Sequence, residues 1–476
     1  MIHKFLINGF NFILDVNSLC VHVVSDLAYK MLDFLNENML KTLPDVILGH
    51  FKSLGFTENE IKDCYEQLYN LKISDKLFSK SFDEELLKYE KNLPIKSMCL
   101  NISHDCNLRC RYCFASTGDF GLKRKLMSFE VSIKAINFLL KNSGSRKNLE
   151  VDFFGGEPLM NFNLIKKIVN YARSLEKKIQ KKFKFTITTN GVLLDDEKID
   201  FINKEMSNVV LSLDGRKEIN DNFRVDSEKN GCYAKIVGLF QKLVRKRDVR
   251  KKYYIRGTFT RHNLDFAEDV RHLVNLGFKY ISIEPVVCDG SFDYSIGRSD
   301  ISEIKKEYEK LTRMLIQNMN SEKEFVFFQL IADLDVGPCA IKRMRSCSCG
   351  NEYIAVTPEG DIYPCHQFVG ENEFKMGNLL AEVFDRNMKN KFSRINMSQK
   401  LACKGCFAKY FCSGGCTANS WKFQGNLLKN HEISCQLQKI RTECAIALAS
   451  VKKLSNINSE KLEFFKNFKK HKTKII

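Results

Sequence analysis

An alternation of strand-like runs with stretches of helical periodicity, between residues 98 and 287, constrains the fold more than any other feature of the sequence. The runs are rich in β-branched and aromatic residues, which favour strands. Between them lie stretches such as 128–142, for which Ser128 is the predicted N-cap. This repeat predicts an α/β fold with a parallel sheet, open or curled into a partial barrel. The strand-like runs are 98–103, 149–154, 183–189, 209–213, 253–260 and 280–287.

A cysteine-rich loop, "HDCNLRCRYCFA", follows the first of these runs. Its thiols, Cys106, Cys110 and Cys113, are too few for a four-ligand structural zinc site and odd in number for disulfides. Three thiolates can hold three irons of a [4Fe–4S] cube and leave the fourth iron open for a small ligand. In α/β folds ligands collect at the C-terminal ends of the strands, where this loop begins. We therefore predict an iron–sulfur cluster at the mouth of the sheet.

The segment "CNLRCRYC" resembles the signature loop of radical S-adenosyl-L-methionine (SAM) enzymes. In that family the open iron chelates SAM, and an electron from the cluster cleaves SAM to a 5′-deoxyadenosyl radical. The resemblance implies that residues 95–325 form the core, a partial (β/α)6 radical SAM barrel. It also implies that Tyr112 and Phe114, on either side of Cys113, belong to the cofactor pocket.

Later strand ends match further parts of that pocket. In "FFGGEP", Gly155 and Gly156 would let backbone groups approach the SAM amino group, and Glu157 would accept from its ammonium. We expect Arg256 and Thr258 to point alternately, so that one of them faces the cavity. Two alternatives to a place in the pocket stay open. Arg224 can be an ordinary surface charge, and Glu284, on the sixth strand-like run, can be a paired core carboxylate. The remaining implied contacts are Thr189 and Asn190 in "TTNG", Ser212 and Asp214 in "SLDG", and Arg224 near the SAM carboxylate.

Half of the 18 cysteines lie between Cys339 and Cys435, which predicts a separate cysteine-built module over residues 335–445. The spacing resembles that of the SPASM domain of peptide-modifying radical SAM enzymes, and structural zinc is the alternative. By this resemblance one auxiliary cluster takes Cys403, Cys406, Cys412 and Cys435. The other takes Cys365, Cys416 and an upstream ligand among Cys339, Cys347 and Cys349. With the SAM cluster, three [4Fe–4S] clusters are implied; a first auxiliary cluster with three ligands would keep an open iron for a substrate thiolate.

Residues 1–90 differ from the rest of the chain in their pattern of apolar and polar residues. Apolar and polar residues alternate there, with turn signals at Asn8-Gly9 and Asn17-Ser18, and helices capped by Ser25 and Thr57 follow. This pattern predicts a small antiparallel sheet with amphipathic helices, a winged-helix-like domain. At the other end, residues 446–476 are interpreted as a basic tail.

The opening "MIHKFLINGFNFILDVNS", the segment "EYIAVTPEGDIYPCHQFVG" and "MGNL" narrow the resemblance to the maturases of six-cysteines-in-forty-five-residues (SCIFF) peptides. That resemblance implies that the N-terminal domain captures the leader of a ribosomal precursor peptide as an added strand. It implies thioether formation between a cysteine sulfur and a carbon radical, and a flavodoxin- or ferredoxin-type electron donor. The sequence does not identify the acceptor residue, so no catalytic side chain is assigned.

Two other functions remain open. One is a SPASM enzyme that oxidises other side chains, by formylglycine formation or carbon–carbon crosslinking. The other is an iron–sulfur transcription regulator, for which the SAM-pocket motifs have no role. The net charge of +18 can attract polyanions, but charge is not sufficient to assign a nucleic-acid partner. Without a signal peptide or a long apolar run, we expect no membrane partner and a reducing cytoplasm.

Overall fold

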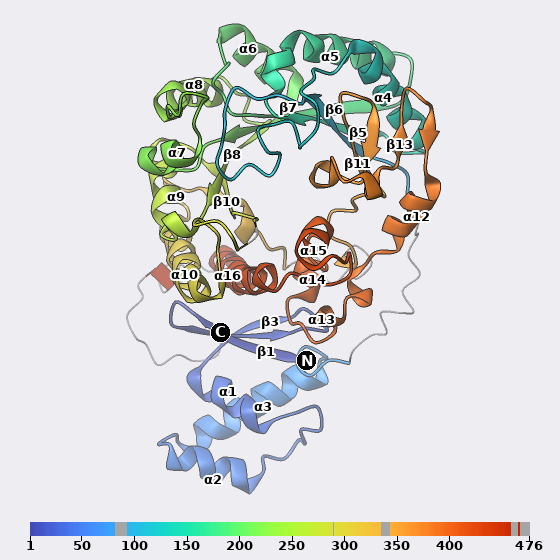
Figure 1. The fold of residues 1–476 in the computed structure, drawn as a ribbon. Helices are drawn as coiled ribbons and strands as arrows, with labels where there is room; N and C mark the ends of the chain where they lie inside the picture. The colour runs from blue at the N-terminus through green and yellow to red at the C-terminus, as the bar shows by residue number, and fades with distance from the viewer. Residues whose placement is uncertain (81–92, 289, 335–342, 458–464, 467–476) are drawn as a thin grey trace.

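The computed structural model describes residues 1–80, 93–288, 290–334, 343–457 and 465–466 (Figure 1). In Figure 1 a curved sheet is covered on its outer side by helices, and a smaller N-terminal lobe, drawn in blue, lies below it. The cysteine-rich segment, drawn in orange, lies beside the inner side of the curve.

The predicted strands form the parallel centre of this sheet and are neighbours in chain order, which confirms the α/β prediction. Each strand is followed by at least one helix. The strands are β4 (Ser97–Ser103), β5 (Asn148–Gly155), β6 (Lys182–Thr189), β7 (Met206–Ser212), β8 (Lys252–Phe259) and β9 (Tyr280–Pro285). The helices are α4 (Phe129–Asn142), α5 (Phe162–Glu176), α6 (Asp196–Glu205), α7 (Lys217–Phe223), α8 (Tyr233–Arg245), α9 (Phe266–Asn275) and α10 (Ile301–Asn318). As predicted, the Ser128 hydroxyl caps α4 by accepting from the Val131 N–H.

The faces of β8 correct one expectation. Side chains alternate along a strand, so residues two apart share a face. Tyr253, Ile255 and Phe259 are buried on one face, whereas Arg256 and Thr258 lie together on the other, less buried face. The expectation that Arg256 and Thr258 point alternately was therefore wrong.

The sheet extends beyond the six predicted strands at both edges. Strand β10 (Val326–Phe327) pairs in parallel with β9, and β11 (Tyr353–Val356) pairs in parallel with β4. Antiparallel β12 (Asp361–Tyr363), β13 (Gly377–Asn378) and β14 (Val383–Phe384) continue from β11. The cysteine-rich segment thus shares the sheet, and the prediction of a separate module was wrong in this respect. Its helices are α12 (Arg386–Arg394), α13 (Leu401–Lys404), α14 (Lys409–Cys412) and α15 (Thr417–Gln424).

The N-terminal lobe contains a three-stranded antiparallel sheet in the order β1-β2-β3, followed by helices. Asn8 and Gly9 both have positive φ, as a tight hairpin turn between the first two strands requires. Ser25 caps the first helix, and Thr57 forms a capping box with Glu60. The elements are β1 (Ile2–Ile7), β2 (Phe10–Asp15), β3 (Val21–Val24), α1 (Asp26–Met31), α2 (Asp45–Ser53) and α3 (Glu58–Ile73).

The long helix α16 (Glu432–Ile457) replaces the first part of the predicted basic tail. Ile446, Ala447 and Val451 are buried in the main hydrophobic core, so the chain stays folded well beyond residue 446. The prediction that a tail begins there was wrong, because these apolar residues recur at helical spacing. Residues 458–464 and 467–476 lie outside the described part of the chain.

Polar contacts of α16 connect the lobe, the cysteine-rich segment and the sheet. The His3 imidazole on β1 contacts Glu443 at 2.9 Å and stacks on the Phe407 ring, with centroids 3.4 Å apart. Arg441 donates from Nη2 to Glu284 Oε2 on β9 at 2.8 Å. Glu284 is therefore a paired carboxylate, one of the two alternatives that the sequence left open.

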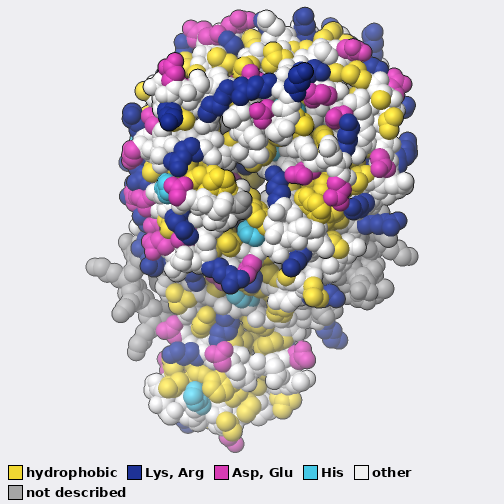
Figure 2. All heavy atoms as spheres, in the orientation of Figure 1, with side chains coloured by type: hydrophobic (Ala, Val, Ile, Leu, Met, Phe, Trp, Pro, Cys, Tyr) yellow, Lys and Arg dark blue, Asp and Glu magenta, His cyan; other side chains and the backbone are white. Residues whose placement is uncertain are grey.

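Charge is not segregated on the face shown in Figure 2, where Lys and Arg side chains are interspersed with Asp and Glu. Among the helices of the described ranges, none is both long and apolar enough to cross a membrane.

We expect Thr57→Ala to weaken α3 by about 1 kcal/mol, because the hydroxyl that accepts from the Glu60 N–H is lost. Amide hydrogen exchange across residues 58–73 should become about fivefold faster. Thr42→Ala is the control, since Thr42 is exposed and precedes α2. Equal exchange rates in α3 of both variants would contradict the capping role.

Candidate functional site

The cysteine loop is attached to the end of β5 by close backbone contacts. Gly156 N donates to Ser103 O at 2.8 Å, and Glu157 N donates to Asp105 O at 2.9 Å. A Cβ on Gly155, whose φ is +123°, would lie 2.3 Å from Ser103 O. A Cβ on Gly156 would lie 2.1 Å from Asp105 O. The two glycines are thus required by the loop itself, which is a different reason from the predicted approach to a cofactor amine.

The three thiols of the loop, Cys106, Cys110 and Cys113, are each partly exposed. Burial raises the pKa of all three thiols, that of Cys106 to about 12. The Cys110 thiol is close enough to the other two thiols that their charges raise its pKa further. In residues 1–80, 93–288, 290–334 and 343–457, no three His, Cys, Asp or Glu side chains are arranged around one metal ion. In an iron–sulfur cube each cysteine binds a different iron, so its ligands need not converge on one point.

Glu157 joins the ends of β5 and β6. Its Oε1 accepts from Leu159 N at 3.0 Å and from Thr189 Oγ1 at 2.8 Å, and its Oε2 accepts from Asn190 N at 2.7 Å. Burial raises the pKa of Glu157 to about 7. Asn190 in turn donates from Nδ2 to Asn107 Oδ1 at 2.8 Å, inside the cysteine loop. The predicted residues of "FFGGEP" and "TTNG" are therefore brought together beside the thiols.

Asp214 is fully buried and engaged by protein groups. Its Oδ2 accepts from Tyr112 Oη at 2.5 Å, and its Oδ1 accepts from Arg224 Nη2 at 3.0 Å and from Thr258 N at 2.9 Å. Asp214 was an implied contact of the SAM pocket, through the segment "SLDG". In the structure Asp214 therefore connects Tyr112 and Arg224, two other residues of the implied pocket.

Arg224 itself is buried, so the alternative of an ordinary surface charge was wrong. Its Nε has no hydrogen-bond partner among the described residues. The guanidinium is also near Cys110, because its charge lowers the pKa of that thiol, although burial raises it more. A buried guanidinium N–H without a partner fits an anionic ligand group next to the cysteine loop. This orphaned donor is consistent with a carboxylate-bearing cofactor at that position.

The other predicted pocket residues lie farther along the inner face of the sheet. Ser212 is half-buried at the end of β7, and Arg256 is exposed on β8. Phe114 is 40% exposed and lies near the His366 ring, with centroids 5.6 Å apart. The Arg256 charge also acts on His366, whose pKa is lowered to about 4, mainly by burial. Phe114 and Arg256 thus lie near the residue that follows Cys365.

Sequence reasoning missed two polar residues of this inner face, His366 and Tyr353. Tyr353 Oη and His366 Nδ1 are 3.2 Å apart. The available signal was the position of His366 directly after Cys365 in "YPCHQF". Tyr353 had no local signal, because it reaches the site through the pairing of β11 with β4.

A first group of thiols in the cysteine-rich segment consists of Cys347, Cys349, Cys365 and Cys416. A hydrogen bond from Cys349 lowers the pKa of Cys347 to about 6, and the same contact raises that of Cys349. Cys365 and Cys416 also raise the pKa of Cys349. Both described candidates for the upstream position are therefore close to Cys365 and Cys416; Cys339 lies outside the described residues.

A second group consists of Cys403, Cys406, Cys412 and Cys435. Burial raises the pKa of Cys412 to about 11, and the charges of the other three thiols raise it further. Burial also raises the pKa of Cys435, and the charge of Cys406 raises it further. The described cysteines of this segment thus lie in two groups, and the first contains two candidates, Cys347 and Cys349, for the one upstream ligand that the resemblance implied.

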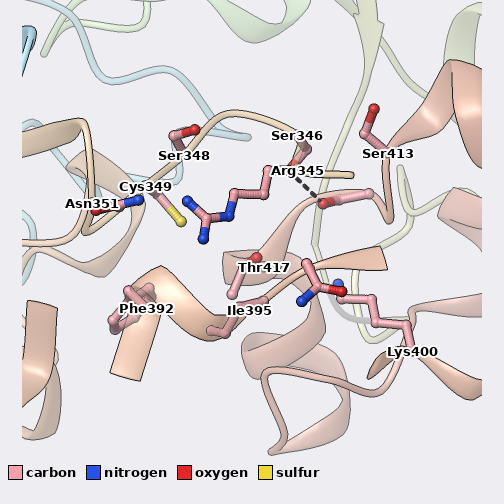
Figure 3. A pocket seen from close by; sticks show the side chains of 12 residues that line it. Arg345, Ser346, Ser348, Cys349, Asn351, Phe392, Ile395, Lys400, Ser413 and Thr417 are labelled. Carbon is pink, nitrogen blue, oxygen red and sulfur yellow. Dashed lines mark hydrogen bonds between the residues drawn. The ribbon is translucent and has the colours of Figure 1, made fainter. Parts of the chain in front are cut away.

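Two cavities border these thiols. Figure 3 shows the smaller, of about 20 Å³, with Arg345, Cys349, Lys400 and Thr417 around it. It has room for about one water molecule. The larger, of about 200 Å³, is lined by Cys412, Cys416 and Cys435 and also by Glu284 and Arg441. This larger cavity connects the end of β9 with both thiol groups.

Comparisons with known proteins agree with this arrangement. The radical SAM superfamily model matches residues 100–270, and that of SPASM, an iron–sulfur cluster-binding domain, matches residues 347–407. A cysteine-type anaerobic sulfatase-maturating enzyme of Clostridium novyi (strain NT) is 25% identical over 334 residues, 67% of this chain and 86% of the relative. The radical SAM cyclopropyl synthase TigE of Paramaledivibacter caminithermalis is 22% identical over 88% of each chain. The solved structure of native anSMEcpe with bound AdoMet and Cp18Cys peptide has a similar fold, with a TM-score of 0.62 at 21% identity, over 77% of this chain and 100% of that one.

Gly156→Ala should displace the cysteine loop, because its Cβ would meet Asp105 O at 2.1 Å. After anaerobic reconstitution we expect this variant to hold about four irons fewer than the unaltered protein, the content of one cube. Gly238→Ala in α8 is the control, since an added Cβ there meets nothing within 4 Å. Equal iron contents in the two variants would show that the loop does not need the glycine contact.

Proposed function

This chain is a radical SAM protein with an iron–sulfur cluster-binding SPASM domain, and we propose that it installs thioether crosslinks in a ribosomally made, cysteine-rich precursor peptide. The observation that carries the proposal is the cavity that lies between the end of the sheet and both thiol groups of the SPASM segment. A peptide side chain held there would lie beside Cys412, Cys416 and Cys435, the proposed ligands of an electron acceptor, and beside the end of β9.

In this proposal Cys106, Cys110 and Cys113 hold a [4Fe–4S] cluster that binds SAM. When bound, this pair supplies a 5′-deoxyadenosyl radical that removes a hydrogen atom from the peptide. The orphaned Nε of Arg224 suits the SAM carboxylate, and Glu157 suits its ammonium. An ammonium beside Glu157 would favour the ionised carboxylate, which opposes the effect of burial.

The two thiol groups of the SPASM segment are proposed to hold one auxiliary cluster each, giving three [4Fe–4S] clusters in all. Bond formation between a peptide carbon radical and a cysteine thiol releases one proton and one electron. The electron needs an acceptor, which is the role assigned to the auxiliary clusters. The first group comprises Cys347, Cys349, Cys365 and Cys416, and the second comprises Cys403, Cys406, Cys412 and Cys435.

The N-terminal sheet is the proposed site of leader capture. Strands β1 and β3 are its outer strands, and an extended peptide can add to such an edge through backbone hydrogen bonds. The contacts of His3 with Glu443 and Phe407 fix this sheet against α16 and the SPASM segment. A captured leader would therefore be held on the same body as the cluster sites. A flavodoxin- or ferredoxin-type protein remains the proposed electron donor.

One observation favours a second candidate, oxidation of another peptide side chain. Cys347 and Cys349 both lie near Cys365 and Cys416, so the first auxiliary cluster can have four protein ligands. A cluster ligated in that way has no open iron for a substrate thiolate. The sulfatase-maturating relative and the cyclopropyl synthase point in the same direction.

The two candidates are separated by the product. The reconstituted enzyme is incubated anaerobically with SAM, a reductant and a cysteine-rich precursor peptide that carries its leader, or with a cysteine-containing sulfatase peptide. Thioether formation removes a pair of hydrogens per ring and protects one thiol per ring from alkylation. We expect this result with the cysteine-rich peptide, and no change when its leader is removed.

Other masses identify the alternative. Carbon–carbon crosslinking removes hydrogens but leaves every thiol open to alkylation, and formylglycine formation replaces a cysteine thiol by an aldehyde. Either product, in place of the protected thiol, would contradict thioether formation and support the second candidate.

A further inference from the structure

A buried cation, Lys400, lies where the two SPASM thiol groups meet. The Lys400 side chain comes from the residue that precedes α13 and is only 2% exposed. Its Nζ donates to Gly414 O at 2.8 Å and to Ser420 Oγ at 3.3 Å. Both acceptors are uncharged, so within these contacts the ammonium has no carboxylate partner.

The acceptors of Lys400 belong to the backbone that carries cysteines of both groups. Gly414 lies between Cys412 of the second group and Cys416 of the first. The Ser420 hydroxyl donates to Cys416 O at 3.1 Å. On the other side, the Lys400 carbonyl accepts from Cys403 N at 2.8 Å. The ammonium is therefore tied to segments that bear ligands of both proposed clusters.

The charges that act on Lys400 point the same way. Burial lowers its pKa, and the thiols that oppose this effect come from both groups: Cys403 and Cys412 from the second, Cys416 and Cys349 from the first. Figure 3 shows Lys400 and Cys349 around the same small pocket. Ligand thiolates of both groups would supply the negative charge that stabilises a buried ammonium whose hydrogen-bond acceptors are uncharged.

The reduction potential of an iron–sulfur cluster depends on the net charge around it. A cluster gains one negative charge on reduction, and a fixed cation in a water-poor site stabilises that form more than the oxidised form. A cation between two clusters acts on both at once.

We propose that Lys400 is a counterion shared by the two auxiliary clusters, which makes the midpoint potentials of both more positive and so favours electron transfer from the peptide to them. This inference rests on the proposed function only in assuming that both thiol groups hold clusters. In this proposal Lys400 contacts neither substrate nor SAM. It acts only through its positive charge, which lies near both clusters.

The test is a potentiometric titration of the iron-loaded, full-length enzyme followed by electron paramagnetic resonance. Spectra with and without SAM identify the SAM-binding cluster, whose signal changes, and leave the auxiliary signals for analysis. Four variants are compared: Lys400→Met removes the charge, Lys400→Gln removes it but keeps an N–H donor, Lys400→Arg keeps it, and Lys404→Met removes an exposed charge beside Cys403.

We expect both auxiliary midpoint potentials to fall in Lys400→Met and Lys400→Gln, by at least a tenfold change in each reduction equilibrium, about 59 mV for a one-electron couple. Lys400→Arg and Lys404→Met should stay close to the unaltered enzyme. A structural role for the side chain would lower iron content without moving the potentials of the clusters that remain.

Potentials that stay unchanged in Lys400→Gln at full iron content, or a shift confined to one cluster, would overturn the inference. If Lys400→Met loses iron, Lys400→Gln carries the test, because it removes the charge but keeps an N–H donor. The titration needs no peptide, so a failure of thioether formation leaves its result valid. If the unaltered enzyme has no auxiliary signals, the proposed function itself is contradicted.

Discussion

The backbone contact between the cysteine loop and Gly155–Gly156 is the constraint on which the rest of the site depends. The carbonyls of Ser103 and Asp105 occupy the positions that two Cβ atoms would need, so the loop can lie against β5 only where side chains are absent. A third glycine, Gly118, packs against the same loop, and a Cβ on it would lie 2.7 Å from the Cβ of Cys106. This packing fixes the thiols at the mouth of the sheet, beside the ends of the neighbouring strands.

Much of this arrangement could be predicted from the sequence, because its signals are local. Strand boundaries followed β-branched and aromatic runs, and the Asn8-Gly9 turn and the caps at Ser25, Thr57 and Ser128 each depend on a few neighbouring residues. The parallel pairing of the strands followed from the repeated strand–helix pattern. The two sets of SPASM cysteines followed from the resemblance rather than from the residues themselves.

The features that could not be predicted are those that depend on contacts between distant segments. Nothing near Tyr353 indicates that β11 pairs with β4 and brings the cysteine-rich segment into the sheet. The hydrogen bonds of Asp214 with Tyr112 and Arg224 join segments that are distant in the sequence, and only the fold reveals them. Similarly, the buried environment of Lys400 arises from the packing of two cysteine-bearing segments, and a lysine in the sequence gives no sign of it.

The most direct test of the central claim, that Cys106, Cys110 and Cys113 hold the cluster that cleaves SAM, is a measurement of 5′-deoxyadenosine. The anaerobically reconstituted enzyme and a variant with all three cysteines replaced by alanine are each given SAM and dithionite. The account predicts 5′-deoxyadenosine from the unaltered enzyme alone, with iron falling from about twelve to about eight per chain in the variant. Continued SAM cleavage by the variant, or zinc in place of iron in the anaerobically purified protein, would contradict it.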